Sequence, residues 1–235
     1  MKLAACALAA ALLAGCASTP QQGPGMTAEQ WARAHDRLEA LRKTWVPSTS
    51  TVPIRGRFHD ARFGGDIEGR GAIAFRRPDA LRMMLVTPAG VTAFDLWIRG
   101  DRFRMAMPLQ GRIVRGDRTT SGTDLPVAFL RWWLLRPLDG RLVAATSDSY
   151  VLRDDGATYE VKPHADGSID VERRAGATTE RIHAQKPGCG AASYVHDALH
   201  LEVGIECDLG GEKSGEPDPR AFEDPDAVGP GATPP

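Results

Sequence analysis

Apolar and polar residues alternate one by one in four short segments between residues 73 and 107. A period of two is the pattern of a β-strand, whose successive side chains point to opposite faces of a sheet. Turn-forming residues such as Pro78-Asp79 and Gly100-Asp101 separate the segments. The apolar positions are Ile73, Phe75, Leu81, Met83, Leu85, Phe94, Leu96, Ile98, Phe103, Met105 and Met107. The positions between and beside them include Arg76, Arg82, Asp95, Trp97, Arg99, Arg102 and Arg104. We therefore predict an antiparallel meander with one apolar face and one face toward water.

Further strands are expected in the second half of the chain. Asp154-Asp155-Gly156 and Asp166-Gly167 contain residues that tolerate the positive φ of tight hairpin turns. From Leu199 to Cys207 apolar and polar residues alternate without a break. The predicted fold class is therefore mainly β, of the α+β type, with helices added to the sheet.

The folded domain is expected to open with a helix. Thr27 followed by Gln30 fits a capping box, and Pro47 ends the helical pattern. The apolar residues near helical spacing are Trp31, Leu38, Leu41 and Trp45. We interpret this segment as a helix that packs on the sheet that follows it.

A second helix is predicted at residues 124–135, where Asp124 can cap the first turn and Pro126 suits it. Its apolar residues surround nearly the whole helix axis, so it requires burial on more than one side. A curved sheet with an apolar concave face would supply this burial. A helix across the mouth of such a sheet would act as a plug or lid.

The N-terminus has the layout of a secretory signal, because Lys2 precedes an apolar run at residues 3–13 and small residues follow. The run is shorter than the roughly 20 apolar residues that a bilayer-spanning helix needs. Leu13-Ala14-Gly15-Cys16 resembles the bacterial lipobox, in which a peptidase cuts before the cysteine and the cysteine is acylated. The resemblance implies a signal peptide at residues 1–15 and a lipid anchor on Cys16, and Ala17 favours the outer membrane, facing the periplasm.

Composition divides the rest of the chain. Residues 16–26 are rich in Ser, Thr, Pro, Gln and Gly, which is typical of a flexible tether, and residues 27–208 form the folded domain. Residues 209–235 combine low hydrophobicity with many Pro, Gly and acidic residues, so a disordered acidic tail is predicted. Residues 206–226 contain eight acids and two bases, a net charge of -6 in a chain of net charge -1, so the folded body is basic.

The four cysteines are reduced to two candidates for a disulfide. Cys6 leaves with the signal peptide and Cys16 carries the lipid, so Cys189 and Cys207 remain. An exported protein reaches an oxidising compartment, where a disulfide persists. The sequence leaves open whether Cys189 and Cys207 are bonded.

Residues 71–82, 87–90 and Phe94-Asp95 resemble the outer-membrane lipoprotein carrier and receptor family, the LolA/LolB-like proteins. In that family a strand ending in Arg-Pro leads to a second strand, a Pro-containing turn and a third strand. A Pro-initiated apolar helix follows later in the chain, as Leu125-Pro126-Val127 does here. The resemblance covers residues 55–135.

The resemblance implies an unclosed antiparallel β-barrel, a strongly curved sheet covered by helices, whose apolar cavity takes the acyl chains of a lipoprotein. Arg77 matches the family arginine that holds the lid closed. The turn at Pro88, Gly90 and Val91 sits where the membrane-anchored receptor has an apolar loop for lipid delivery, and Val91 is the aliphatic residue available there. The residues expected to line the lipid-binding cavity are Ile73, Phe75, Leu81, Met83, Leu85, Phe94, Leu96, Ile98, Phe103, Met105, Phe129, Leu130 and Trp133.

Catalytic and cofactor-binding motifs are missing from the sequence. It contains no Gly-x-Ser-x-Gly, phosphate loop or dinucleotide fingerprint. His196 and His200 have a spacing that chelates zinc on a helix, but on a strand four residues span roughly 13 Å, too far to share a metal. We expect no enzymatic activity, no metal and no cofactor, and export argues against a nucleic-acid partner.

Two functions remain. The first is a membrane-anchored periplasmic lipoprotein that binds lipid or lipoprotein acyl chains in an apolar cavity, in lipoprotein localisation or envelope lipid trafficking. The second is a non-catalytic structural or assembly lipoprotein of the cell envelope that uses the same sheet as a filled core and docks a protein partner. The interior volume separates them, since an interior already packed by Trp132, Trp133 and the methionines favours the second.

Overall fold

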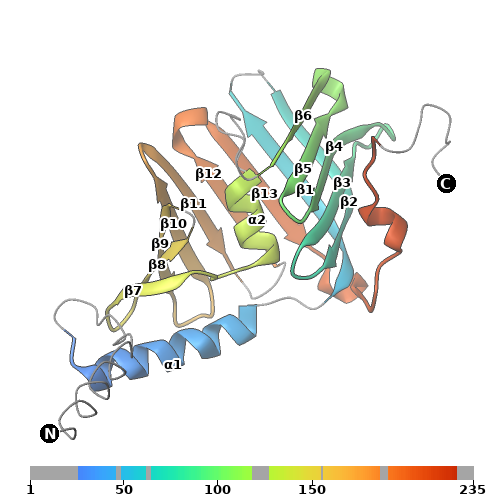
Figure 1. The fold of residues 1–235 in the computed structure, drawn as a ribbon. Coiled ribbons are helices and arrows are strands. Elements are labelled where there is room, and N and C mark those ends of the chain that lie inside the picture. The colour runs from blue at the N-terminus through green and yellow to red at the C-terminus, as the bar shows by residue number, and fades with distance from the viewer. Residues whose placement is uncertain are drawn as a thin grey trace, which may run out of the picture.

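The computed structural model describes residues 26–45, 49–61, 65–117, 127–154, 156–185 and 190–226. These described residues form one antiparallel sheet and two α-helices, shown in Figure 1. The strands are β1 (Ser50–Asp60), β2 (Gly65–Arg76), β3 (Ala80–Val86), β4 (Thr92–Arg99), β5 (Arg102–Met107), β6 (Arg112–Gly116), β7 (Arg141–Ala145), β8 (Tyr150–Asp154), β9 (Ala157–Pro163), β10 (Ile169–Ala175), β11 (Thr178–Ala184), β12 (Ala192–His196), β13 (Leu201–Cys207) and β14 (Lys213–Ser214). The helices are α1 (Ala28–Trp45) and α2 (Val127–Leu135), with short 3-10 turns η1 (Pro108–Gln110), η2 (Asp197–Leu199), η3 (Leu209–Gly211) and η4 (Pro219–Phe222).

The sheet is curved but does not close into a barrel. Its strand order is β6-β5-β4-β3-β2-β1-β13-β12-β11-β10-β9-β8-β7, with β14 pairing to β1. The long strand β1 pairs with β2 on one side and with β13 on the other, so it joins the two halves of the chain. Within the described residues β6 and β7 are the edges, and α2 lies between them in sequence and in space (Figure 1). The prediction of an unclosed, curved antiparallel sheet with an N-terminal helix and a covering helix is confirmed.

The alternation in the sequence produces the two faces of the sheet. On β3 the side chains of Leu81, Met83 and Leu85 are buried, and each is paired across the ladder with a buried residue of β4. A slip of one residue would turn these side chains to the outer face, so burial fixes the register. Gly71 on β2 lies where a Cβ atom would come within 1.7 Å of the carbonyl oxygen of Met84. This glycine therefore permits the close approach of β2 and β3.

Strand β13 is shorter than the alternation from Leu199 to Cys207 predicts. It begins at Leu201 rather than Leu199, because η2 occupies residues 197–199 and His200 adopts a left-handed φ of 49°. His196 and His200 therefore lie on the two sides of a turn and not on one strand. Among the residues that the structure describes, no cluster of three or more His, Cys, Asp or Glu side chains is placed to hold a metal.

The first helix begins with the predicted capping box. The backbone N–H of Thr27 donates to Gln30 Oε1 at 2.8 Å, and the N–H of Gln30 donates to Thr27 Oγ1 at 3.2 Å. These bonds satisfy two donors that have no partner inside the helix. Arg42, near the other end, donates to the carbonyl oxygens of Leu138 and Gly140 beside β7. The helix is thereby fixed below the β7 end of the sheet (Figure 1).

The prediction of a disordered tail from residue 209 is wrong as far as residue 226. We call residues 216–226 the C-terminal strap, because they run across the outer face of β3 to β6 (Figure 1). Phe222 is fully buried against Ala74 and Ala80, and the guanidinium of Arg76 lies 4.8 Å from its ring. Trp97 Nε1 donates to the carbonyl oxygen of Phe222 at 3.1 Å.

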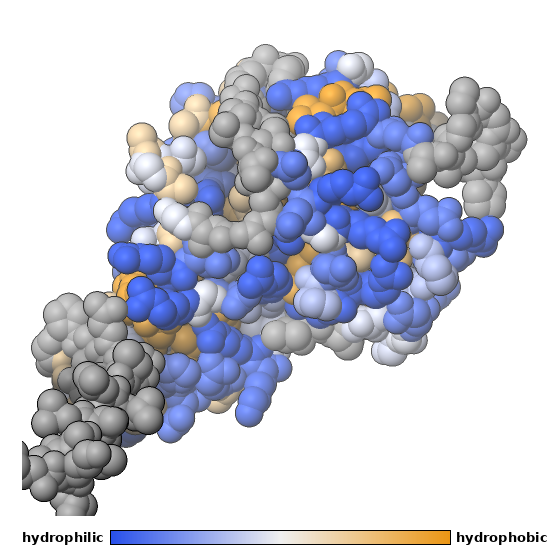
Figure 2. Space-filling model, viewed as in Figure 1, coloured by the Kyte–Doolittle hydropathy of each residue, from blue (hydrophilic) through white to orange (hydrophobic). Residues whose placement is uncertain are grey.

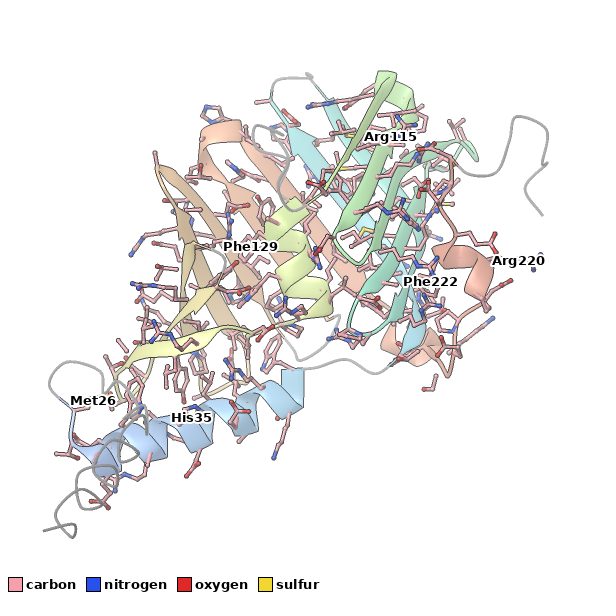
Figure 3. All side chains as sticks on the ribbon, viewed as in Figure 1. Met26, His35, Arg115, Phe129, Arg220 and Phe222 are labelled. Carbon is pink, nitrogen blue, oxygen red and sulfur yellow. The ribbon has the colours of Figure 1, made fainter. Side chains whose placement is uncertain are left out.

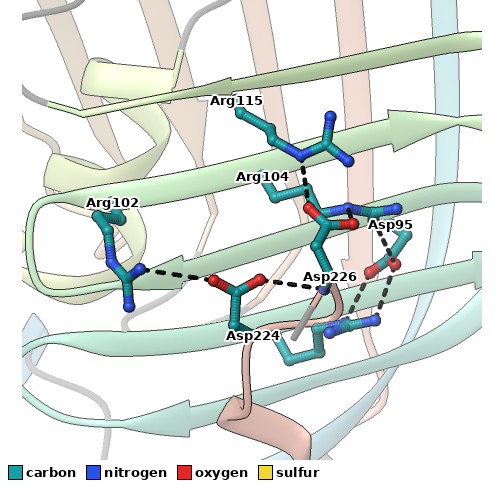
Figure 4. Close-up of polar contacts among 7 residues, drawn as sticks. Asp95, Arg102, Arg104, Arg115, Asp224 and Asp226 are labelled. Atoms are coloured by element: carbon teal, nitrogen blue, oxygen red, sulfur yellow. Dashed lines mark hydrogen bonds and ion pairs between the residues drawn. The ribbon is translucent and has the colours of Figure 1, made fainter. Parts of the chain in front are cut away.

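Ion pairs hold the end of the C-terminal strap (Figure 4). Asp224 pairs with Arg102 at 3.5 Å, and Asp226 pairs with Arg104 at 3.1 Å and with Arg115. The Arg115 guanidinium, as the main cause, holds the pKa of Asp226 below its usual range. Low hydrophobicity predicted disorder, but one aromatic anchor and acids matched to a basic surface offset the cost of ordering.

The C-terminal strap also corrects the prediction that the outer face of the meander meets water. Asp95 and Trp97 point to that face, yet they are only 8% and 2% exposed. Asp95 pairs with Arg82 at 2.6 Å and with Arg104 at 3.3 Å. Burial is the main cause that raises the pKa of Asp95, although both arginines oppose the rise.

Several predicted features lie outside the described residues. These are the signal peptide at 1–15, Cys16, the tether to residue 25, Cys189 and the tail from residue 227. Cys207 is disulfide-bonded. Its pairing with Cys189 stays a prediction.

Candidate functional site

The second helix fills the concave side of the sheet. Of its residues, Val127, Phe129, Leu130, Trp132, Trp133, Leu134 and Leu135 are buried. This all-round burial explains why the helix is apolar on nearly every side. It packs against both halves of the sheet and against α1, since the rings of Trp133 and Trp45 lie 5.6 Å apart. Figure 3 shows Phe129 on the side of α2 that faces β9 to β12.

The residues predicted to line a cavity come together on this concave side. They all belong to one buried cluster that also contains α2: Ile73, Phe75, Leu81, Met83, Leu85, Phe94, Leu96, Ile98, Phe103, Met105, Phe129, Leu130 and Trp133. Their burial follows from the inward positions of β2 to β5 and from the position of α2. Their role in binding lipid stays a prediction.

The space inside this cluster is small. An apolar hollow of about 40 Å³ lies between α2 and the strand ends. Its lining includes Phe58, Phe94, Met105, Leu130 and Leu201, and the rings of Phe58 and Phe94 stack at 4.7 Å. Ligand pockets commonly have volumes of about 300–1,000 Å³. Among the described residues this hollow is too small for an acyl chain, so a long ligand enters it only if α2 moves.

Arg77 connects the sheet to α2. Its Nη1 donates to the carbonyl oxygen of Leu135 at 2.7 Å, and its Nη2 donates to the carbonyl oxygen of Leu134 at 2.6 Å. These carbonyls belong to the last turn of the helix, where a cation also interacts favourably with the helix dipole. Burial lowers the pKa of Arg77 to about 10, so the side chain remains charged at neutral pH. The peptide bond from Arg77 to Pro78 is cis.

A row of polar residues crosses the inner face beneath α2. Tyr159, Arg173, Glu180 and His196 are successive ladder partners on β9, β10, β11 and β12. Arg173 pairs with Glu180 and donates from Nε to the hydroxyl of Tyr159 at 3.3 Å. Tyr194 donates its hydroxyl hydrogen to Glu180 Oε1 at 2.8 Å. Sequence reasoning missed this row, although Arg173 and Glu180 stand at inward positions of strands with a period of two.

The predicted delivery turn is exposed. Gly90 has a φ of 81° between β3 and β4, and the side chain of Val91 is 45% exposed. Two further apolar residues, Leu109 and Ile113, are 52% and 49% exposed around the neighbouring turn between β5 and β6. Figure 2 shows apolar residues gathered at this end of the molecule. Only Val91 was predicted from the sequence at this end of the sheet, where Leu109 supplies a bulkier exposed aliphatic side chain.

A second hollow among the described residues has a charged lining. It measures about 910 Å³ and opens over β12, β13, β1 and β2. Its lining carries charges of both signs, from residues that include Arg55, Arg57, Arg70, Glu68 and Glu206. Such a surface does not suit acyl chains, so the apolar interior under α2 remains the candidate site. In the part of the chain that the structure describes, no helix is both long and apolar enough to cross a bilayer.

Comparisons with known proteins agree with this fold. No protein-family model matches the chain. The chain is 26% identical over 166 residues to the outer-membrane lipoprotein LolB of Yersinia enterocolitica serotype O:8 / biotype 1B, a match that covers 66% of this chain and 76% of that protein.

Solved structures are similar to this chain in fold. An outer-membrane lipoprotein-sorting protein domain from Vibrio parahaemolyticus superposes with a TM-score of 0.54 at 14% identity, covering 84% of this chain and 97% of that one. A LolA superfamily protein from Nitrosomonas europaea has a TM-score of 0.45 at 11% identity, covering 81% and 97%, which is too low to carry an argument. The chain is thus similar in sequence to a LolB lipoprotein and shares the fold of a lipoprotein-sorting protein domain, in agreement with the resemblance found in its sequence.

Proposed function

We propose that this LolA/LolB-like protein binds lipid or lipoprotein acyl chains beneath α2, in lipoprotein localisation or envelope lipid trafficking. The observation that carries the proposal is an apolar helix laid across the inner face of an unclosed sheet. A closed sheet with a continuous core would have no such separable part. Here the inner surface of β2 to β5 is apolar and its cover is a single short helix.

Opening follows from how α2 is attached. Its hydrogen bonds to the sheet include those that Arg77 donates to the carbonyl oxygens of Leu134 and Leu135, in the last turn of the helix. Displacing α2 exposes the apolar inner face to a guest of equal apolarity, so burial is exchanged rather than lost. The methionines Met83 and Met105 suit guests of variable shape, because thioether chains are flexible.

The membrane anchor and location belong to the same proposal. The LolB relative is described as an outer-membrane lipoprotein. A lipid on Cys16 would hold this chain on the outer membrane, facing the periplasm. The exposed turn residues Val91 and Leu109 would then contact the bilayer when a guest is passed on. The role is one of binding and transfer, and needs no catalytic group.

One observation favours the second function. The interior is filled by Trp132, Trp133 and the methionines, with a residual hollow of about 40 Å³. This is what a structural or assembly lipoprotein with a solid core, docking a protein partner, would have. The two functions differ in whether α2 moves to admit a lipid.

The test is a titration of the purified protein with a fluorescent acyl probe, together with native mass spectrometry for copurified lipid. Saturable binding with a stoichiometry near one supports the carrier function. Absence of both binding and copurified lipid, in protein shown to be folded by circular dichroism, supports the second function instead.

A further inference from the structure

The polar row beneath α2 is unusual in its surroundings. Glu180 is 2% exposed, and the side chain of Arg173 is 14% exposed. Replacing a buried ion pair with apolar residues is often neutral or stabilising, so such a pair is not explained by stability alone. Although burial opposes it, the carboxylate of Glu180 and the hydroxyl of Tyr159 keep the pKa of Arg173 above its usual range.

The row is covered by α2. Trp132 stacks on Tyr159 with ring centroids 4.2 Å apart and an angle of 15°. Phe129 lies 5.6 Å from Tyr194 and 6.2 Å from Tyr159. Any movement of α2 that opens the apolar interior therefore uncovers these hydroxyl groups and the guanidinium.

The row also adjoins the small apolar hollow. His196, the last residue of the row, is the ladder partner of Leu201, which lines the hollow. A lipid whose acyl chain lies in the enlarged hollow would have its more polar end beside this polar row. The hydroxyl of Tyr159 accepts a hydrogen bond from Arg173, and among the described residues none accepts the hydrogen of that hydroxyl. The hydroxyl of Tyr159 can therefore donate a hydrogen bond to a ligand.

Resting on the proposed function, we infer that Tyr159, Arg173, Glu180 and Tyr194 form a polar subsite for the carbonyl oxygens of an acyl ester or amide linkage. The Tyr159 hydroxyl and the Arg173 guanidinium donate and a carbonyl oxygen accepts, while Glu180, itself hydrogen-bonded by Tyr194, holds Arg173 in place. An amphiphile with ester or amide groups next to its chains fits the site better than a plain hydrocarbon. The subsite therefore selects acyl lipids by their linkage, and the apolar interior accommodates the length of the chain.

The test compares two probes that differ by one linkage. These are 1-pyrenyldodecane and the methyl ester of 12-(1-pyrenyl)dodecanoic acid, titrated against the full chain by fluorescence. We expect the wild type to bind the ester about 5- to 10-fold more tightly, the value of one added hydrogen bond. Tyr159→Phe should abolish this preference while leaving the affinity for the hydrocarbon unchanged. A change in the hydrocarbon affinity would point to a general packing defect.

A matched control is Tyr150→Phe, which removes a hydroxyl from another buried tyrosine on β8, outside the row. It should keep the ester preference. A second variant, Arg173→Met combined with Glu180→Leu, removes the ion pair without leaving a buried charge and should lose the preference as well. Equal affinity of the wild type for both probes, or an equal loss in Tyr159→Phe and Tyr150→Phe, overturns the subsite but leaves the proposed function standing. Binding of neither probe overturns both.

Discussion

Replacing Arg77 with methionine tests how strongly its hydrogen bonds hold α2 against the sheet. The substitution removes the two hydrogen bonds to the carbonyl oxygens of Leu134 and Leu135 and keeps a side chain of similar length. Hydrogen bonds to a charged group contribute about 1.5–3 kcal/mol each, but water replaces part of this when the helix end is freed. A net loss of about 2 kcal/mol is reasonable, and it corresponds to roughly a 30-fold shift from the closed to the open position of α2.

The shift predicts tighter lipid binding rather than weaker binding. When the competent state is a small fraction of the population, apparent affinity rises in proportion to that fraction. The apparent Kd of Arg77→Met for a fluorescent acyl probe should therefore fall by roughly 30-fold relative to the wild type. Fluorescence titration at equal protein concentration measures this.

The control is Arg76→Met, which alters the adjacent residue on the outer face, where its guanidinium lies over Phe222. It should leave probe affinity unchanged. An unchanged or weaker affinity in folded Arg77→Met protein would refute the reasoning that these two bonds keep α2 closed.

Four further results are expected. Phe222→Ala should lower the free energy of unfolding by up to about 3 kcal/mol in urea denaturation and make the C-terminal strap sensitive to proteases, whereas resistance to cleavage would show that the ion pairs suffice. The contact of Asp226 with Arg115 depends on a carboxylate whose pKa is lowered in the folded state, so its stabilisation is present above the usual Asp pKa and is lost as pH falls through the lowered value. The protection of the strap amides against hydrogen exchange, relative to their intrinsic rates, should therefore fall there and in high salt. Gly71→Ala should destabilise the protein by about 2 kcal/mol or more in thermal unfolding, while Gly204→Ala, which meets open space, should cost far less. Phe94→Asp should abolish acyl-probe binding and Phe94→Leu should retain it, and unchanged binding by folded Phe94→Asp protein would count against an interior site.

The sequence predicted most of the fold because its strands carry a local signal. The alternation of Leu81, Met83 and Leu85 fixes a strand, its buried face and its register together. The capping box at Thr27 and Gln30 likewise depends on residues three apart. The apolar residues of α2 predicted burial on several sides, and the curved sheet supplies it.

Contacts between distant residues were harder to predict. The composition of the C-terminal strap predicts disorder. Its order depends instead on the packing of Phe222 against Ala74 and on ion pairs with arginines more than 100 residues away, which composition does not reveal. The polar row was missed for the same reason. In the sequence Arg173 and Glu180 resemble solvent-facing charges, and only the register of the sheet brings them together under α2. The size of the interior also depends on how the aromatic side chains of α2 pack, and a pattern of apolar residues does not determine that.

We propose that acyl chains bind where α2 now lies and displace it. Spin labels at two exposed positions, Ala128 on α2 and Ser193 on β12, would report this distance by pulsed electron resonance with and without a saturating acyl probe. If the probe displaces α2, the distance distribution becomes longer and broader in its presence. An unchanged distribution in protein that demonstrably binds the probe would contradict it.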